Sequence, residues 1–197
     1  MGEGSWRERL AAARLEQGLV EGLACFLDLL QKWGGVCDLT AVERPEELIR
    51  DHVLESLVAS PWLHSGRLLD LGSGNGFPAI PLLLARGDVR GLLVEPRLRR
   101  WAFLKEVVRE LGLRAEVWRG RVEDVEVEGA ENLTVRALAP RVWAPEVGRL
   151  VGLGGRVFWW AGSRAEATPP TGFSLVVTCP LPNPTRGRLV VWGRCST

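Results

Sequence analysis

The sequence predicts an α/β fold with a mainly parallel β-sheet, a C-terminal antiparallel hairpin and a helical N-terminal extension. From residue 67 onward, apolar segments of strand length alternate with segments of helical periodicity. This alternation is typical of parallel strands joined by right-handed crossovers. Two later apolar runs, 173–179 and 188–192, flank a proline-rich turn and resemble a closing hairpin. We expect a helical extension over residues 1–63 and one compact domain over residues 64–197.

The N-terminal extension contains three segments with helical signals. The expected helices cover residues 5–17, 20–33 and 46–60. Ser5 is a suitable N-cap for the first helix, and Gly18 is expected to end it. Gly34-Gly35 is expected to end the second helix, and Pro45 suits the first turn of the third. The extension is therefore expected to be entirely helical.

The domain that follows is expected to contain five strands before the hairpin. The predicted strands are 67–71, 90–95, 114–119, 133–135 and 155–160. The predicted helices between them are 78–86, 97–111 and 143–151. In an open sheet of this kind a ligand binds at the carboxyl ends of the strands, near the point where the strand order reverses.

The first of these strands ends in the most informative stretch of the chain. Asp70 is followed by glycines at positions 72, 74 and 76, then by Phe77, and Glu95 ends the next strand. The third glycine is one residue too early for the dinucleotide pattern G-x-G-x-x-G, and G-x-G-x-G instead resembles an S-adenosylmethionine loop. Asp70 would then lie near the amino-acid end of the cofactor and Glu95 would accept hydrogen bonds from the ribose. The alternative is a tight turn with structural glycines.

Two more segments are expected at the same edge of the sheet. Residues 120–124 follow the third strand, where Val122 and Glu123 are candidates for contact with the adenine of the cofactor. Arg136 follows the fourth strand and is the first candidate for ordering the active site, by contacting the cofactor carboxylate or RNA. Arg121 is the second candidate. For both arginines the alternative is a structural ion pair.

The overall charge excludes a strongly basic nucleic-acid-binding protein, since 25 basic and 24 acidic side chains leave a net charge of +1. Residues 97–121 are nevertheless locally basic. The candidates for RNA contact in this segment are Arg97, Arg99, Arg100 and Trp101, the last by stacking on a base. The alternative is a solvated helix face. The charged N-terminus and the lack of a membrane-length apolar run predict a cytoplasmic protein, and the cysteine spacing predicts no metal site.

Five segments in order resemble one family, the ribosomal RNA small subunit methyltransferase G family, also called glucose-inhibited division protein B. The matching segments are Gln31-Lys32-Trp33 with Asp38-Leu39-Thr40, His52-Val53-Leu54-Glu55-Ser56-Leu57, the run 72–81, Glu95-Pro96 with Arg99-Arg100 and Phe103-Leu104, and Arg121-Val122-Glu123 with Arg136-Ala137. The resemblance covers about residues 25–160. It implies a Rossmann-like S-adenosylmethionine-dependent methyltransferase fold.

The resemblance also implies a reaction, methylation of guanine N7 in 16S ribosomal RNA with S-adenosyl-L-methionine as cofactor. Guanine N7 carries an in-plane lone pair and no proton, so its methylation needs positioning and no general base. The expected partner is small-subunit ribosomal RNA or the assembled subunit, with no membrane, and the protein is expected to act as a monomer. One departure is the family lysine before Gly162, which is absent here; Arg186 or Arg188 is the candidate replacement.

Other functions remain as alternatives. The protein could methylate another RNA or a small molecule, or bind the cofactor without catalysis as a ribosome-assembly or regulatory partner. An adenine-N6 enzyme would need an Asn/Asp-Pro-Pro-aromatic motif after the fourth strand, and 136–140 has none. A cytosine-C5 enzyme would need a cysteine nucleophile, and Cys179 lies in the late hairpin. We expect His52 and Glu55 to form a structural pair that links the extension to the domain.

Overall fold

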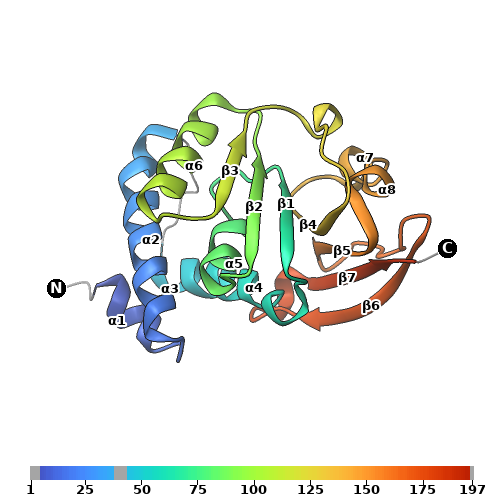
Figure 1. Ribbon diagram of the computed structural model, residues 1–197. Coiled ribbons are helices and arrows are strands. Elements are labelled where there is room, and N and C mark those ends of the chain that lie inside the picture. The colour runs from blue at the N-terminus through green and yellow to red at the C-terminus, as the bar shows by residue number, and fades with distance from the viewer. Residues whose placement is uncertain (1–4, 38–43, 196–197) are drawn as a thin grey trace.

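The computed structural model describes residues 5–37 and 44–195. The family-like segment Asp38-Leu39-Thr40 lies outside these residues. The chain forms a seven-stranded sheet of order β3-β2-β1-β4-β5-β7-β6 (Figure 1). Strands β1 to β5 are parallel, and β7 is antiparallel to both β5 and β6. The predicted fold class, with its parallel sheet, closing hairpin and helical extension, is confirmed.

All the predicted strands are present. They are β1 (Gly66–Leu71), β2 (Val89–Val94), β3 (Ala115–Trp118), β4 (Ala130–Arg136), β5 (Val151–Ala161), β6 (Phe173–Pro180) and β7 (Arg188–Arg194). Two of them begin three or more residues earlier than predicted. Strand β4 starts three residues before the apolar run that predicts it, and β5 starts four residues early, with an irregular register where β4 and β5 first pair.

The helical extension differs from the prediction at its glycines. Helix α1 (Trp6–Ala11) is capped by Ser5 as expected but ends at Ala11 instead of near residue 17, whereas α2 (Gln17–Cys37) has Gly18 in its first turn and continues through Gly34-Gly35. A glycine inside a helix costs about 1 kcal/mol. Helix α2 offsets this by burying an apolar stripe, whose fully buried members are Leu23, Ala24, Phe26 and Leu27. Tertiary packing therefore outweighs the glycine signals.

The predicted third helix, 46–60, is a run of four short helical segments of three kinds, with a turn at residues 58–59 before the last. It comprises α3 (Pro45–Leu48), the π-helical segment Ile49–Leu54, α4 (Glu55–Leu57) and the 3₁₀ turn Ser60–Trp62. Pro45 stands at its start, as expected. π-helical turns are rare and frequently mark functional sites, and this one contains Asp51 and His52.

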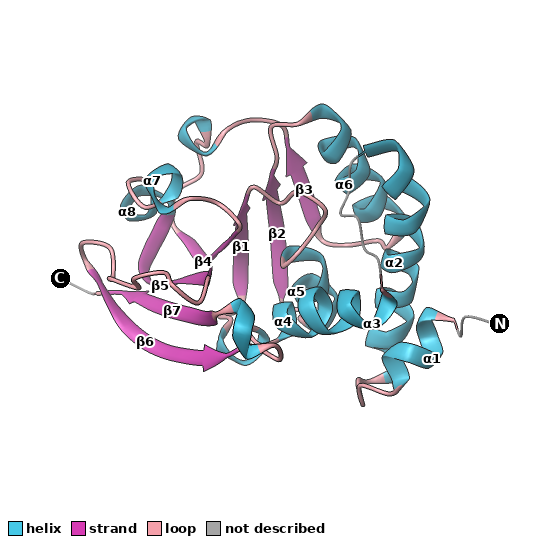
Figure 2. Cartoon of the chain, turned by 180° about the vertical axis from the view of Figure 1, so that it is seen from behind, coloured by secondary structure: helices cyan, strands magenta, loops and turns pink. Residues whose placement is uncertain are grey.

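Two apolar cores lie on opposite faces of the sheet. One face packs against α5 (Ala79–Ala85) and α6 (Leu98–Glu110), and α2 contacts both of these helices, lying beside α6 in the view of Figure 2. The other core contains Trp143, Trp159 and Trp192 together with α7 (Pro140–Trp143) and α8 (Val147–Leu150). The single helix predicted over 143–151 is wrong. Two short helices take its place, because β5 already begins at Val151 to pair with Ala130.

The second face is covered unevenly. Beside β4 and β5, helices α7 and α8 pack on this face. Over β1 to β3, the described residues that pack on it come from the loop after β3 and include Val122, Val125 and Val127. Within residues 5–37 and 44–195, no helix combines the length and apolar character needed to cross a bilayer.

Candidate functional site at the carboxyl edge of the sheet

The strand order reverses at β1, which lies between β2 and β4. The loops that follow β1, β2, β3 and β4 therefore meet at one edge of the sheet, and a ligand site is expected there. These loops contain the glycine turn, Glu95, the segment 120–124 and the segment 136–140. The sequence predicted all four at this edge.

The glycine turn follows β1 with the positive φ angles that only glycine adopts easily. Gly72, Gly74 and Gly76 have φ values of 72°, 56° and 92°. A side chain at Gly72 would meet Leu138 from the loop after β4, at 2.8 Å, and one at Gly76 would meet Ile80 at the same distance. Phe77 is buried and its ring lies 5.1 Å from that of Phe26. The turn is therefore held closely between α2, α5 and the loop after β4.

Glu95 closes the turn from the side of β2. Its Oε2 accepts a hydrogen bond from the Gly74 N–H and its Oε1 accepts one from the Arg97 N–H, both at 2.9 Å. The side chain is 3% exposed. A carboxylate offers about four lone-pair positions, so Glu95 can accept further hydrogen bonds beside these two. Glu95 lies where the sequence placed it, and it also fixes the glycine turn to the start of α6.

Asp70 is the last polar group of β1 and is buried in the sheet. Its Oδ1 accepts a hydrogen bond of 2.6 Å from the Thr134 hydroxyl on β4, and its Oδ2 has no hydrogen-bond partner among the described residues. Burial raises the pKa of Asp70 to about 6, against the hydrogen bonds from Thr134 and Ser73, which lower it. A buried carboxylate oxygen without a donor is costly and is frequently a binding group.

Arg136 ends β4 and reaches the helical extension. Its Nη2 donates to Glu55 Oε2 at 2.8 Å and to the backbone oxygen of Asp51 at 2.7 Å. Glu55 is 1% exposed, and the pKa of Glu55 is raised by burial against the lowering effects of Arg136 and Arg186. Glu55 links the extension to the domain as predicted, but its partner is Arg136, and no hydrogen bond or ion pair between Glu55 and His52 is observed in the described part of the chain.

Arg136 retains one unused donor. Its Nη1 is buried and has no hydrogen-bond partner within residues 5–37 and 44–195. Asp70 is the register partner of Thr134, and Arg136 follows two residues farther along the same neighbouring strand. One unpaired carboxylate oxygen and one unpaired guanidinium nitrogen thus lie near each other at the switch point. A ligand with both a cationic and an anionic group, such as the amino-acid end of S-adenosylmethionine, fits this pair.

The C-terminal hairpin adds a second arginine, Arg186, beside Glu55 and Asp51. We call Arg136, Glu55, Asp51 and Arg186 the Arg136 cluster. Arg186 Nε lies 3.3 Å from Glu55 Oε1, and its Nη1 lies 3.5 Å from Asp51 Oδ2. Arg188 instead pairs with Ala161 across β5 and β7, and its Nη2 donates to the Ala165 backbone oxygen. Of the two candidates for the charge of the missing lysine, Arg186 is the one that joins the Arg136 cluster.

His52 faces the glycine turn from the π-helical segment. Its ring lies 5.1 Å from that of Phe77. Burial lowers the pKa of His52 to about 4, helped by Arg136 and Arg186. The imidazole is therefore neutral at pH 7, and packing against Phe77 is its observed role.

The adenine candidates lie farther out. Val122 is buried in the second core, whereas Glu123 is half exposed and lies 3.7 Å from Arg121 as a surface ion pair. The Arg121 side chain is 74% exposed. Arg121 thus pairs with a neighbour in its own loop, and no contact between it and the Arg136 cluster is found among the described residues.

The basic residues predicted for RNA contact lie beside the glycine turn. Arg97 precedes α6, and Arg99 and Arg100 lie in its first turn, which contains no acidic residue. Arg100 approaches Gly74 closely, since a Cβ at that glycine would lie 3.5 Å from the Arg100 Nη1. Trp101 is half buried, and its indole N–H donates to the Val117 oxygen at 3.1 Å. This bond fastens α6 to β3.

Two residues of the site, Thr134 and Asp51, were not predicted as site residues from the sequence. Thr134 is a polar residue inside the apolar run Leu133-Thr134-Val135, and the register places it beside Asp70. Asp51 stands where the family commonly has a basic residue, and it contacts Arg50, Asn183 and Arg186. Two sequence signals could have identified them: the polar residue within a buried strand for Thr134, and the reversed charge relative to the family for Asp51.

Comparison with solved structures supports the fold. A methyltransferase from Geobacter sulfurreducens is 13% identical, with a TM-score of 0.63 over 87% of this chain and 88% of that one. An RNA methyltransferase from Salinibacter ruber, solved with S-adenosyl-L-homocysteine, is 20% identical, with a TM-score of 0.57 over 74% of this chain and 91% of that one. At these identities the likeness concerns the fold alone.

Comparison with curated sequences identifies the family. The ribosomal RNA small subunit methyltransferase G of Stenotrophomonas maltophilia (strain K279a) is 39% identical over 131 residues, which are 66% of this chain and 62% of that protein. The Methylococcus capsulatus protein of the same name is 38% identical over 75% of this chain and 73% of its own. The family's sequence model, described as rRNA small subunit methyltransferase G, matches residues 20–168. The chain therefore belongs to the rRNA small subunit methyltransferase G family.

Proposed function

We propose that this protein methylates guanine N7 in small-subunit ribosomal RNA with S-adenosylmethionine as the methyl donor. The observation that carries the proposal is the pair of buried, unpaired groups at the switch point, Asp70 Oδ2 and Arg136 Nη1. They match the ammonium and the carboxylate of the cofactor's amino-acid end. Membership of the family and the S-adenosylhomocysteine complex of the Salinibacter ruber protein support the same cofactor.

The residues of this chain would act by binding and orientation. Asp70 would hold the ammonium and Arg136 the carboxylate, while the backbone of Gly72 to Gly76 would line the cofactor and Glu95 would accept hydrogen bonds from the ribose beside those from Gly74 and Arg97. When bound, S-adenosylmethionine supplies an electrophilic methyl group. Since guanine N7 has no proton to lose, the site needs no general base, and the neutral His52 is not required as one.

The Arg136 cluster would hold the Arg136 side chain in position for the cofactor. Glu55 receives Arg136 on one oxygen and Arg186 on the other, so the helical extension, β4 and the C-terminal hairpin meet at one carboxylate. Arg186 would thereby supply the positive charge that the family lysine provides before Gly162. Arg97, Arg99 and Arg100 would contact RNA phosphates beside the glycine turn.

Transfer of labelled methyl from S-adenosylmethionine to small-subunit RNA, naked and as assembled subunits, tests this function. Borohydride–aniline treatment then cleaves the RNA at N7-methylguanine. We expect a single cleavage site that is absent with Arg136→Ala and present with Arg141→Ala, an exposed arginine on α7. No transfer to either substrate by a protein that binds S-adenosylhomocysteine would overturn the RNA assignment. Transfer without cleavage would overturn the N7 assignment.

A further inference from the structure

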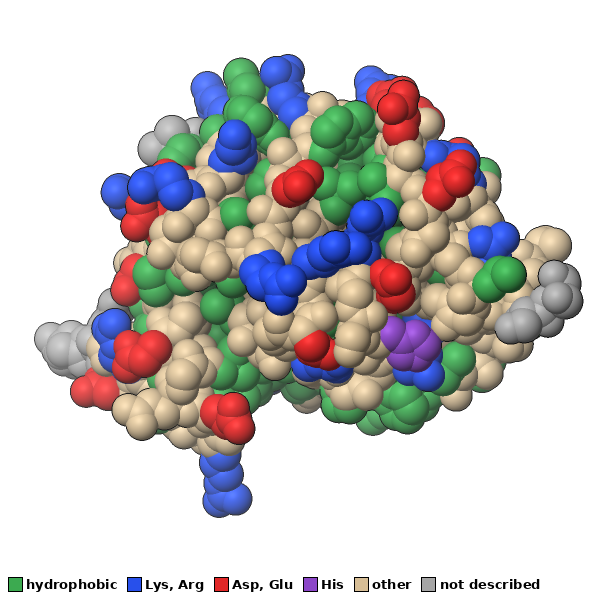
Figure 3. Space-filling view, in the orientation of Figure 1, with side chains coloured by type: hydrophobic (Ala, Val, Ile, Leu, Met, Phe, Trp, Pro, Cys, Tyr) green, Lys and Arg blue, Asp and Glu red, His purple; other side chains and the backbone are tan. Residues whose placement is uncertain are grey.

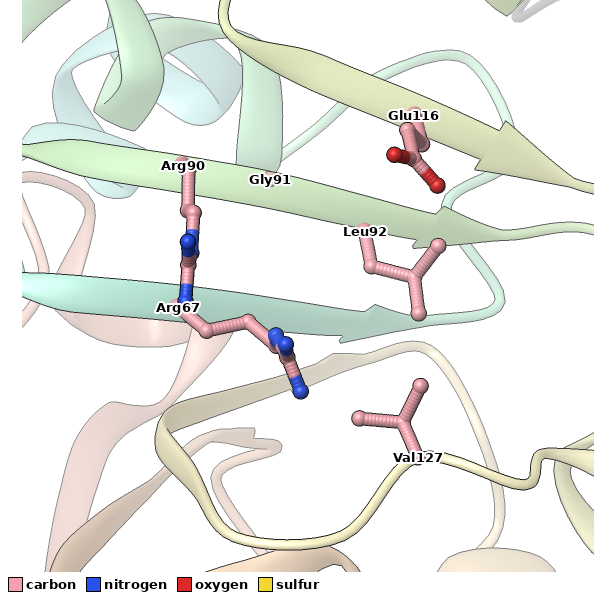
Figure 4. A pocket seen from close by; sticks show the side chains of 6 residues that line it. All are labelled: Arg67, Arg90, Gly91, Leu92, Glu116 and Val127. Carbon is pink, nitrogen blue, oxygen red and sulfur yellow. The ribbon is translucent and has the colours of Figure 1, made fainter.

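The face of the sheet opposite α5 holds a pocket of about 170 Å³ over β1 to β3 (Figure 4). The residues that line it are Arg67, Arg90, Gly91, Leu92, Glu116 and Val127. The site described above lies at the carboxyl edge, whereas this pocket lies toward the beginnings of the strands. From Arg67 to Leu71 the strand advances four residues, or about 13 Å. The pocket is therefore separate from the glycine turn.

Three arginines are aligned across this face. Arg67 on β1 is the register partner of Arg90 on β2. Gly91 pairs with Ala115, so Arg114, immediately before β3, is level with Arg90. Side chains at one level of a sheet project to the same face. With neighbouring strands about 4.8 Å apart, the backbone positions of the row span about 10 Å. Figure 3 shows basic side chains in a row across the centre of this face.

Two carboxylates lie near this row without forming an ion pair with it among the described residues: Glu131 Oε2 accepts a hydrogen bond of 2.7 Å from the Arg67 backbone N–H, and Glu116 lines the same pocket. No ion pair of Arg67, Arg90 or Arg114 is observed there, and the one side-chain hydrogen bond of the row runs from Arg114 to the Gly87 backbone oxygen. Glu116 is the register partner of Leu92, two residues along β2 from Arg90. Like charges directly opposite one another destabilise a sheet. The alignment is thus unfavourable for the protein alone and favourable for binding an extended anion.

We propose that Arg67, Arg90 and Arg114 bind the phosphate backbone of the RNA substrate, at a second contact surface remote from the reacting guanine. This proposal rests on the proposed function, because it takes RNA as the substrate. Guanidinium groups suit phosphate oxygens, and backbone contacts position an RNA without reading its sequence. A continuous strand of nucleotides that starts at the carboxyl edge can cover the distance of about 13 Å to the row. The apolar side chains of Leu92 and Val127 line the pocket beside the arginine row.

The test compares the triple variant Arg67→Gln, Arg90→Gln, Arg114→Gln with a control that has the same charge loss. The control is Arg7→Gln, Arg14→Gln, Arg44→Gln, three exposed arginines of the helical extension. Binding to a labelled small-subunit RNA is followed by fluorescence anisotropy between about 50 and 200 mM salt. Each lost phosphate contact reduces the slope of log K against log salt by about 0.7 to 0.9.

For the triple variant we expect an affinity loss of about tenfold or more and a slope reduced by about 2. In methyl transfer, KM for RNA is expected to rise by a similar factor with kcat within about twofold, because the contact is the same in ground and transition states. Affinity and slope like those of the wild type, or equal losses in the control, would overturn the proposal. Should the triple variant fail to fold, Arg90→Glu at an exposed position gives the same readout.

The two proposals fail in different ways. RNA affinity and its salt dependence are measured without any methyl transfer. If the triple variant binds RNA more weakly than the wild type but the wild type transfers no methyl group, the proposed function is contradicted and the proposal of the arginine row as an RNA contact stands. If the wild type and the triple variant methylate RNA equally well, only the proposal that the arginine row binds RNA is contradicted.

Discussion

At the scale of single residues, the site depends on buried charges that are only partly compensated. Asp70 is buried with one unpaired oxygen, and Arg136 has one unpaired nitrogen. Removing a charge from water is costly unless it is paired. Natural proteins retain such groups mainly where a ligand uses them. The site thus lowers the stability of the ligand-free fold, and pH and substitution make this measurable.

The first prediction concerns Asp70. Its pKa is raised from 3.8 to about 6 in the folded protein. The folded state therefore binds more protons than the unfolded state between these values, so the stabilisation by protonated Asp70 is complete below pH 4 and is lost as the pH rises through 6. The loss is at most about 3 kcal/mol. Asp70→Asn is expected to remove this pH dependence and to increase the free energy of unfolding at pH 7, measured by urea denaturation. A less stable Asp70→Asn protein at pH 7 would contradict this.

The second prediction has the opposite sign. The pKa of His52 is lowered from 6.5 to about 4. The unfolded state then binds the additional proton, so stability is present above pH 6.5 and is lost as the pH falls through 4. His52→Gln is expected to flatten this acid limb by up to about 3 kcal/mol. Urea denaturation of the single and double variants separates the two opposing effects. An unchanged acid limb in His52→Gln would show that the histidine is charged in the folded state.

At the scale of elements, one carboxylate joins three parts of the fold. Glu55 in α4 contacts Arg136 of β4 and Arg186 of the hairpin. Glu55→Gln leaves Arg136 as a buried charge without its counterion, and breaking one side of a buried pair costs about 3 to 5 kcal/mol. Arg186→Gln removes the more exposed partner and is expected to cost about 1 kcal/mol or less. Thermal unfolding monitored by circular dichroism compares the two. Equal losses would contradict the assignment of Arg136 as the principal partner.

The tryptophan cluster is the second element-scale feature. The rings of Trp143, Trp159 and Trp192 lie 5.6 to 6.2 Å apart, and the indole N–H groups of Trp143 and Trp192 are buried without an acceptor among the described residues. Trp143→Ala is expected to cost about 3 to 5 kcal/mol of stability through the cavity it leaves. Trp143→Phe keeps an aromatic ring and removes the unpaired N–H, so its cost is expected to be below about 2 kcal/mol. Similar costs in urea denaturation would indicate a hidden acceptor.

At the scale of the whole molecule, the sequence predicts the sheet better than the helices. The strands follow from continuous apolar runs, and their parallel order follows from the alternation with helices. The glycine signals at Gly18 and Gly34-Gly35 were misleading because α2 is stabilised by burial against α5 and α6. The helix predicted over 143–151 fails for a related reason, since pairing with β4 draws Val151 into β5.

The candidate site was predictable in its position and less so in its contacts. The glycine turn, Asp70, Glu95 and Arg136 meet at the expected edge because the carboxyl ends of parallel strands meet there. The partners of Arg136 come from residues 51 and 55, more than 80 positions away in the sequence. The arginine row likewise depends on the register of three strands. Such long-range pairings are set by the fold and have no local sequence signal.

The central claim is that Asp70 and Arg136 bind the amino-acid end of S-adenosylmethionine. Isothermal titration with S-adenosylhomocysteine and with 5′-methylthioadenosine, which lacks that end, tests it most directly. We expect the wild type to prefer S-adenosylhomocysteine by about 100-fold or more, as two charge-assisted contacts of about 1.5 to 3 kcal/mol each allow. Asp70→Asn and Arg136→Gln should each reduce this preference at least tenfold while affinity for 5′-methylthioadenosine stays the same. An unchanged preference in both variants would contradict the claim.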